Sequence, residues 1–134
     1  MKQIILIFLI LTMIITSGFK SRKGIILFNK QPINEKNVLS NTKFYSSGER
    51  IYYLFIAPKR MKNDYIRVQI FKMTDKAPWG GYEVVRTKDF RLMKDEKYYH
   101  TDYFVLYEKG KYIMQVFSTE DFQRPLSLGD FYIR

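Results

Sequence analysis

Apolar and polar residues alternate along much of the chain beyond residue 24, and this alternation predicts β-strands. The clearest case is residues 64–73, DYIRVQIFKM, where Ile66, Val68 and Ile70 fall on one face and Arg67 and Gln69 fall on the other. A period of two over this length is typical of a strand with one buried face. Residues 50–57, RIYYLFIA, are apolar at almost every position, which predicts a central strand covered on both faces.

Shorter apolar or aromatic runs predict further strands at residues 24–28, 82–90, 98–107, 111–118 and 128–134. The triplet EKG before residue 111 has the length and the glycine of a tight hairpin turn, and the last run is expected to form an edge strand. No segment of ten or more residues beyond residue 18 keeps a helical period. The pattern therefore predicts an all-β fold, an antiparallel β-sandwich of seven to eight strands.

The first 18 residues have a different character. A positively charged start is followed by 13 almost uninterrupted apolar residues, 4–16, and then by the small residues Ser17 and Gly18. This order is typical of a secretory signal peptide, and the run is short for a membrane span of about 20 residues. Basic residues at 20, 22 and 23 leave an uncleaved anchor open as the alternative. We expect residues 1–18 to be a signal peptide or anchor, residues 19–134 to be one domain, and the protein to be exported to the periplasm or the exterior.

A tyrosine stands two residues after a glycine at the start of the strand predicted at residues 111–118. This Gly110-x-Tyr112 spacing resembles that of immunoglobulin-type sandwiches, whose tyrosine tucks into the core and bonds back to the backbone a few residues upstream. GERIYYLF, residues 48–55, resembles the second strand of the same family. The resemblance implies that Phe55 and Met114 replace the family's two cysteines by an apolar pair. It concerns the fold alone and implies no catalytic residue; another antiparallel sandwich or barrel is the alternative.

The composition excludes several kinds of chemistry. The chain has no cysteine, so disulfides, cysteine-bound zinc, iron–sulfur clusters and thiol catalysis are ruled out, and its one histidine rules out a site with several histidines from one chain. His100 and Asp102 are two apart on one predicted strand and are interpreted as a polar pair at the surface. We find no catalytic motif, and expect no enzyme activity, no metal and no cofactor.

The charge and the aromatic residues suggest where a partner binds. Residues 1–18 contain one of the 23 basic residues and none of the 13 acidic ones, so the remainder carries 22 basic and 13 acidic residues, a net charge of +9. Such a domain attracts anionic neighbours, although scattered lysines that only favour solubility explain the charge as well. The candidate contacts are an aromatic loop and two basic clusters: Trp79, Tyr82, Lys59, Arg60, Lys62, Arg86, Lys88 and Arg91. In a strand, Arg86 and Lys88 share a face that Arg91 does not.

Taken together, these features predict an exported, non-enzymatic β-sandwich that binds or scaffolds another component of the cell envelope or exterior. A carbohydrate- or polyanion-binding module that uses Trp79, Tyr82 and the basic clusters is the alternative. The expected partner is a protein or glycan, nucleic acid is not expected, and a membrane is contacted only through an uncleaved N-terminal segment.

Overall fold

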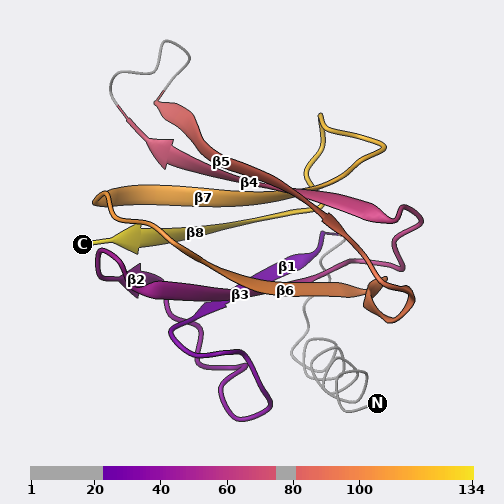
Figure 1. The fold of residues 1–134 in the computed structure, drawn as a ribbon, viewed down its shortest axis with the longest axis horizontal. Coiled ribbons are helices and arrows are strands. Elements are labelled where there is room, and N and C mark those ends of the chain that lie inside the picture. Colours follow the sequence, from indigo (N-terminus) through magenta and orange to yellow (C-terminus); the bar gives the residue numbers. More distant parts are fainter. Residues whose placement is uncertain (1–22, 75–80) are drawn as a thin grey trace.

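The computed structural model describes residues 23–74 and 81–134, which form two β-sheets packed face to face (Figure 1). The strands are β1 (Ile25–Asn29), β2 (Phe44–Tyr45), β3 (Arg50–Ile56), β4 (Tyr65–Met73), β5 (Tyr82–Arg91), β6 (Tyr99–Val105), β7 (Gly110–Ser118) and β8 (Ser127–Ile133). A short 3₁₀ helix, η1 (Lys94–Glu96), is the one helical element in these ranges. Within the same residues there is no helix with the length and apolarity that crossing a membrane requires. The predicted all-β sandwich is confirmed; the predicted signal segment lies outside the described residues.

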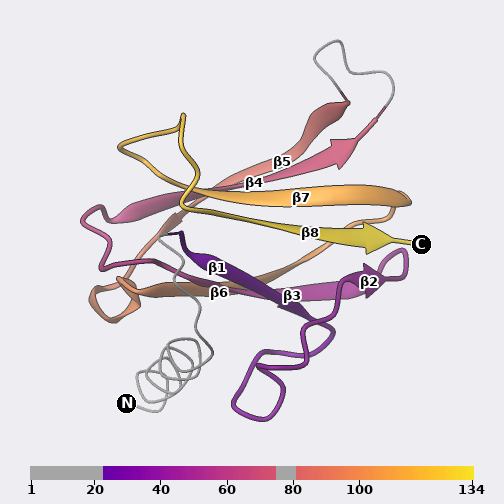
Figure 2. The same ribbon diagram turned by 180° about the vertical axis from the view of Figure 1, so that it is seen from behind.

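One sheet has the strand order β1-β3-β6 and the other has the order β2-β8-β7-β4-β5. All neighbouring strands pair antiparallel except β2 and β8, which are parallel. The strands run in two layers when seen from either side, and the hairpin of β4 and β5 extends beyond the rest of the five-stranded sheet (Figures 1 and 2).

The core lies between the layers and follows the alternation read from the sequence. On β4 the predicted inward residues Ile66, Val68 and Ile70 are all buried, and on β7 so are Tyr112 and Met114. Because successive side chains of a strand point to opposite faces, alternate apolar positions are enough to place these residues in the core.

β3 is covered on both faces, as its continuous apolar run predicts. Ile51 and Phe55 face the main core, whereas Leu54 and Ile56 belong to a second buried cluster on the outer side of the three-stranded sheet. Val38, from the connection between β1 and β2, completes this second cluster. The connection is anchored by the side-chain amide of Asn29, which donates hydrogen bonds to the carbonyl oxygens of Asn37 and Ser40.

The chain crosses between the sheets at residues 106–109, so the predicted hairpin turn EKG is wrong: β6 and β7 lie in different sheets. The predicted role of Tyr112 is confirmed, because its hydroxyl donates a hydrogen bond to the carbonyl oxygen of Glu108, four residues upstream. Its ring is buried and stacks on Phe131. The tyrosine thus fixes the backbone at the crossing.

The edges of the sheets also differ from the prediction. β8 is not an edge strand, since β2 pairs with it through Phe44–Tyr45 and forms the edge instead. β5 forms the other edge of the five-stranded sheet, and the described residues place no strand beside it.

The two sides of the sandwich are closed to different degrees. Beside β1 and β8, the amide of Gly24 donates to the carbonyl oxygen of Leu126 and the hydroxyl of Ser127 donates to the carbonyl oxygen of Gly24. On the opposite side, β5 and β6 leave an opening between the two sheets. This opening contains the candidate functional site.

Candidate functional site

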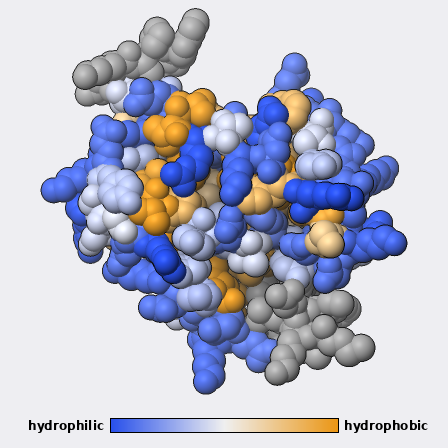
Figure 3. Space-filling view, viewed as in Figure 1, coloured by the Kyte–Doolittle hydropathy of each residue, from blue (hydrophilic) through white to orange (hydrophobic). Residues whose placement is uncertain are grey.

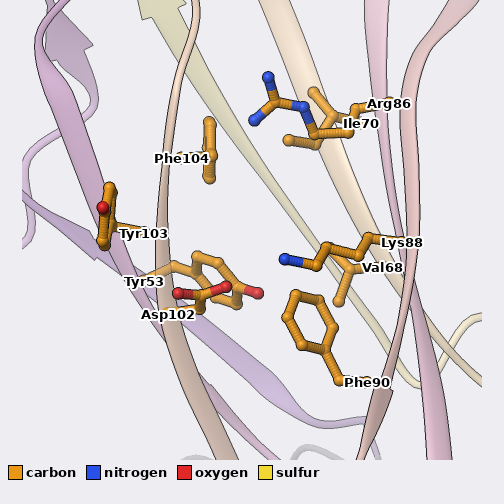
Figure 4. Close-up of a pocket in the computed structure, with 9 residues that line it drawn as sticks. All are labelled: Tyr53, Val68, Ile70, Arg86, Lys88, Phe90, Asp102, Tyr103 and Phe104. Carbon is orange, nitrogen blue, oxygen red and sulfur yellow. The ribbon is translucent and has the colours of Figure 1, made fainter.

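A small cleft lies between β5 and β6 and has a volume of about 60 Å³ (Figure 4). This space suits a few water molecules or one small ionic group, since one water needs about 10–15 Å³. The cleft combines apolar, aromatic and charged side chains from four strands of both sheets: Tyr53, Val68, Ile70, Arg86, Lys88, Phe90, Asp102, Tyr103 and Phe104.

Arg86 and Lys88 reach the cleft because of the register between β4 and β5. Arg86 pairs with Ile70 and Lys88 pairs with Val68, and these two β4 residues face the core. Directly opposed residues point to the same face of a sheet, so both cations point inward from the free edge. The prediction that Arg86 and Lys88 share a face without Arg91 is confirmed, since Arg91 pairs with the outward-facing, exposed Tyr65.

Neither cation at the cleft has a carboxylate partner among the described residues. The described residues contain five ion pairs, Lys30–Glu49, Lys43–Asp130, Arg67–Asp89, Lys72–Glu108 and Lys97–Asp64. Arg86 instead donates to the carbonyl oxygen of Val105 on β6 at 3.3 Å, and the ammonium of Lys88 lies 4.8 Å from the ring centroid of Phe90. Both side chains are exposed, so their positive charge is accessible from the solvent.

Behind the cleft lies a buried pair of aromatic polar groups. The hydroxyl of Tyr53 and Nε2 of His100 are hydrogen-bonded at 3.1 Å, and the rings of His100 and Phe90 are 4.3 Å apart between centroids. The pKa of His100 is lowered to about 4, mainly by burial; Asp102 opposes this shift and Lys88 adds to it. The imidazole is therefore neutral at pH 7. The interpretation of His100 and Asp102 as a polar pair at the surface is wrong for His100, which is only 5% exposed.

Asp102 is half-buried and lines the cleft beside Tyr53. In the close-up, its carboxylate, the Tyr53 hydroxyl and the Lys88 ammonium all point into the same space (Figure 4). Among the described residues, its carboxylate joins no ion pair and accepts no hydrogen bond. The cleft thus presents two cations and one carboxylate that are free to meet a ligand.

The other predicted contacts do not join this site. Lys59, Arg60 and Lys62 are exposed on the connection between β3 and β4, where the buried Met61 between them donates its backbone N–H to the carbonyl oxygen of Lys97. Tyr82 is half-buried at the start of β5. Trp79 lies outside the described residues, and with it half of the aromatic pair proposed to bind a carbohydrate.

Three aromatic residues of the cleft are absent from the predicted site: Tyr53, Phe90 and Phe104. From the sequence each is predicted only to be part of a strand. The signal that could have identified Phe104 is its even-numbered position on the same strand as His100 and Asp102, which places the three side chains on one face. No group of three or more metal-binding side chains occurs within residues 23–74 and 81–134.

The face seen in Figure 3 is mostly hydrophilic, and its apolar residues form separate small patches among the polar ones. The face seen in this view therefore offers no broad apolar area for a partner.

Comparison with known proteins gives little further information. No protein-family model and no curated protein matches the chain. One solved structure that resembles it is that of Pseudomonas fluorescens alkylpurine DNA glycosylase AlkC bound to DNA containing an abasic site analog. The match has a TM-score of 0.42 and 12% sequence identity, and covers 90% of this chain and 33% of the other. This chain therefore spans about a third of the length of the protein it matches.

This comparison contradicts three predictions made from the sequence. The similar structure is that of an enzyme bound to DNA. The prediction of a non-enzymatic protein that binds or scaffolds a component of the cell envelope or exterior, the expected lack of enzyme activity and the exclusion of nucleic acid are therefore withdrawn as wrong. Because the likeness is weak, it assigns no residue role and no activity to this chain, and the ligand has to be inferred from the chain's own side chains.

Proposed function

We propose that the domain binds a phosphate-bearing ligand, with the phosphate group held by Arg86 and Lys88 at the mouth of the cleft. The observation that carries this proposal is that both cations point from one face of β5 into the cleft and that neither is paired with a carboxylate within residues 23–74 and 81–134. The five ion-paired cations, by contrast, already have an anionic partner within the protein.

The two side chains supply complementary contacts. An arginine guanidinium offers several N–H donors in a fixed planar arrangement that matches phosphate, and a lysine ammonium adds a mobile point charge. Arg86 is already oriented by its hydrogen bond to the carbonyl oxygen of Val105, so less conformational entropy is lost when it binds. Phosphate is available both as the free ion and at the end of a nucleic-acid strand, and the two sources share this chemistry.

Titration of the purified protein with inorganic phosphate, and separately with a fluorescent single-stranded oligonucleotide carrying a 5′-phosphate, tests the proposal. We expect the double substitution Arg86→Gln and Lys88→Gln to weaken binding of at least one of these probes more than about tenfold at 0.15 M salt, which corresponds to about 1.4 kcal/mol. Competition by free phosphate against the oligonucleotide distinguishes a site for the ion alone from a site for a strand end.

The matched control is the double substitution Lys59→Gln and Arg60→Gln, which removes the same charge from an exposed loop. Exposed charges act through fields screened over about 8 Å at physiological salt, so the control should weaken binding less than about twofold. Equal losses in the two double variants would mean that scattered charge, and not the cleft, attracts the anion, and would refute the proposal.

We also propose that the sandwich is immunoglobulin-like. The strand order supports this. In that family the first, second and fifth strands lie in one sheet, and the seventh, sixth and third strands are neighbours in the other. Here β1, β3 and β6 form one sheet, and β8, β7 and β4 are neighbours in the other. The bond from Tyr112 to Glu108 gives further support. So does the complete burial of Phe55 and Met114, which lie on opposite sheets where the family has its cysteines.

We propose in addition that the domain is exported to the periplasm or the exterior after removal of residues 1–18. The support is the sequence of this segment, a charged start followed by a 13-residue run that is apolar apart from two threonines, and then by two small residues. N-terminal sequencing of the native protein should find a new N-terminus near residue 19. An intact Met1 on a membrane-bound form would instead identify the segment as an uncleaved anchor.

A further inference from the structure

We propose that Asp102 makes the cleft selective for a phosphate group that carries a proton, that is, a phosphomonoester or hydrogen phosphate, over sulfate and over a phosphodiester. This inference rests on the proposed function and specifies the ligand of the same site. It follows from the position of one carboxylate beside two unpaired cations.

The fold places Asp102 in the cleft. On β6, inward-facing residues alternate with outward-facing ones, so that Asp102 lies between the buried residues His100 and Phe104 on the inner face. Asp102 also pairs directly with Tyr53 of β3, whose side chain lines the same cleft. Its carboxylate is thus half-buried at a fixed position, while Arg86 and Lys88 reach the cleft from the opposite sheet.

An ionised carboxylate accepts hydrogen bonds and donates none. An anion that enters this cleft therefore has two possibilities. It either donates a hydrogen bond to the Asp102 carboxylate, or it places its unprotonated oxygens against that carboxylate without a hydrogen bond. The singly charged phosphomonoester has a P–O–H group that can donate to Asp102, while its unprotonated oxygens accept hydrogen bonds from Arg86 and Lys88. Sulfate and phosphodiesters carry no such proton at neutral pH, so their oxygens would face the carboxylate without a hydrogen bond.

Charge balance favours the same ligand over the doubly charged sulfate, whereas only the proton distinguishes it from a phosphodiester. Arg86 and Lys88 contribute two positive charges and Asp102 contributes one negative charge, so a singly charged anion neutralises the cleft. A doubly charged anion leaves one negative charge in excess beside a half-buried carboxylate, which is costly where water is partly excluded. Tyr53 and Tyr103 also line this space, and His100 lies behind it. Tyr53 and His100 are neutral at pH 7, because burial raises the pKa of the tyrosine and lowers that of the histidine.

The proton on the ligand predicts a pH dependence. The doubly charged form of a phosphomonoester takes up one proton near pH 6, so the fraction of the singly charged form rises as the pH falls from 8 to 5.5. Binding should strengthen over this range. The pKa of His100, at about 4, lies below this range, so the imidazole stays neutral throughout it.

Calorimetric titration of the full chain with methyl phosphate, dimethyl phosphate and sulfate at pH 6 and pH 8 tests the inference, with Asp102→Asn as the variant. We expect the wild type to bind methyl phosphate at least about tenfold more tightly than either competitor at pH 6, and to lose much of this preference at pH 8. The variant, whose amide can donate a hydrogen bond to sulfate, should bind the three anions within about threefold of one another.

The outcomes separate this inference from the proposed function. If the wild type binds sulfate as tightly as methyl phosphate, and both depend on Arg86 and Lys88, the phosphate site stands and the selectivity assigned to Asp102 is refuted. If none of the three anions binds more tightly to the wild type than to the Arg86 and Lys88 double variant, both proposals are refuted. Should Asp102→Asn fail to fold, as judged by circular dichroism, the pH dependence of the wild type alone decides.

Discussion

At the scale of single residues, the Tyr112 hydroxyl is the contact whose removal is easiest to interpret. It donates to the carbonyl oxygen of Glu108 beside a crossing between sheets, and the ring itself is almost fully buried. Tyr112→Phe keeps the ring and its stacking on Phe131 but removes this hydrogen bond. We expect the free energy of unfolding to fall by about 0.5–1.5 kcal/mol, measured by equilibrium denaturation.

Tyr107→Phe is the control for this substitution. Tyr107 is 74% exposed in the same connection, and its hydroxyl makes no hydrogen bond among the described residues. Its replacement should leave the denaturation midpoint unchanged. Equal midpoints for the Tyr112→Phe protein and the wild type would show that the hydroxyl does not hold the crossing.

His100 gives a second prediction, for the dependence of stability on pH. Its pKa is about 4 in the folded protein and 6.5 in the unfolded chain, so the unfolded chain binds the proton more readily. The stabilisation is complete above pH 6.5 and is lost as the pH falls towards 4. We expect the free energy of unfolding to drop by about 2 kcal/mol between pH 7 and pH 5.

His100→Gln should remove this drop while leaving a partner for the Tyr53 hydroxyl. Asp64, Asp89 and Asp130 have a lowered pKa because each is hydrogen-bonded to a basic side chain, and their contribution falls away only below their ordinary pKa of 3.8. Between pH 7 and 5 the single histidine therefore dominates. A wild type whose stability is constant over this range would contradict the burial of the imidazole.

At the scale of elements, Gly129 controls how closely β8 approaches β1. A Cβ at this position would lie 2.9 Å from the ring of Phe28 and 3.3 Å from Cβ of Ile26. Phe28 is 2% exposed and packs on Phe131, so its ring has little room to move. We expect Gly129→Ala to destabilise the protein by about 1–3 kcal/mol, as overpacked cores do.

Thermal and chemical denaturation measure this effect, and Leu128→Ala is the neighbouring control. Leu128 is 52% exposed on the outer face of the same strand, so its truncation should cost much less. If Gly129→Ala is as stable as the wild type, β1 and β8 can separate, and the closed side of the sandwich is looser than the packing of Phe28 implies.

The elements themselves were largely predictable, because each depends on local alternation. The predicted strands at residues 64–73 and 111–118 match β4 and β7 closely, because apolar and polar residues alternate in a strand with one buried face. The connection EKG was misread as a hairpin because its glycine suits a tight turn as well as a crossing between sheets. β2 was missed because two residues, Phe44 and Tyr45, are too few to show any period.

The site was less predictable than the strands, because it depends on which strands lie opposite each other. The face shared by Arg86 and Lys88 could be read from their spacing. Their position opposite Asp102 and Tyr53 depends on the pairing of β3 with β6 and on the packing of two sheets. The local sequence does not determine which strands of the two sheets lie opposite each other. From the sequence alone, His100 and Asp102 are therefore predicted to be a polar pair at the surface.

At the scale of the whole molecule, the sandwich is tied together on one side and open on the other, and this asymmetry should appear in its dynamics. β7 lies between β8 and β4, whereas β5 pairs with β4 alone, has a bulge opposite Ile70 and Phe71, and has no buried residue. Local opening of a strand costs less free energy when few buried contacts are lost.

We therefore expect amides of β5 that bond to β4 to exchange with deuterium at least about tenfold faster than those of β7, a difference of about 1.4 kcal/mol in opening free energy. Hydrogen exchange followed by NMR resolves the two strands residue by residue, with β3 as the internal reference for a strand covered on both faces. Slow exchange along β5 that matched β7 would mean that its free edge is covered in solution, and the cleft beside it would then be closed to the anion that Arg86 and Lys88 are proposed to hold.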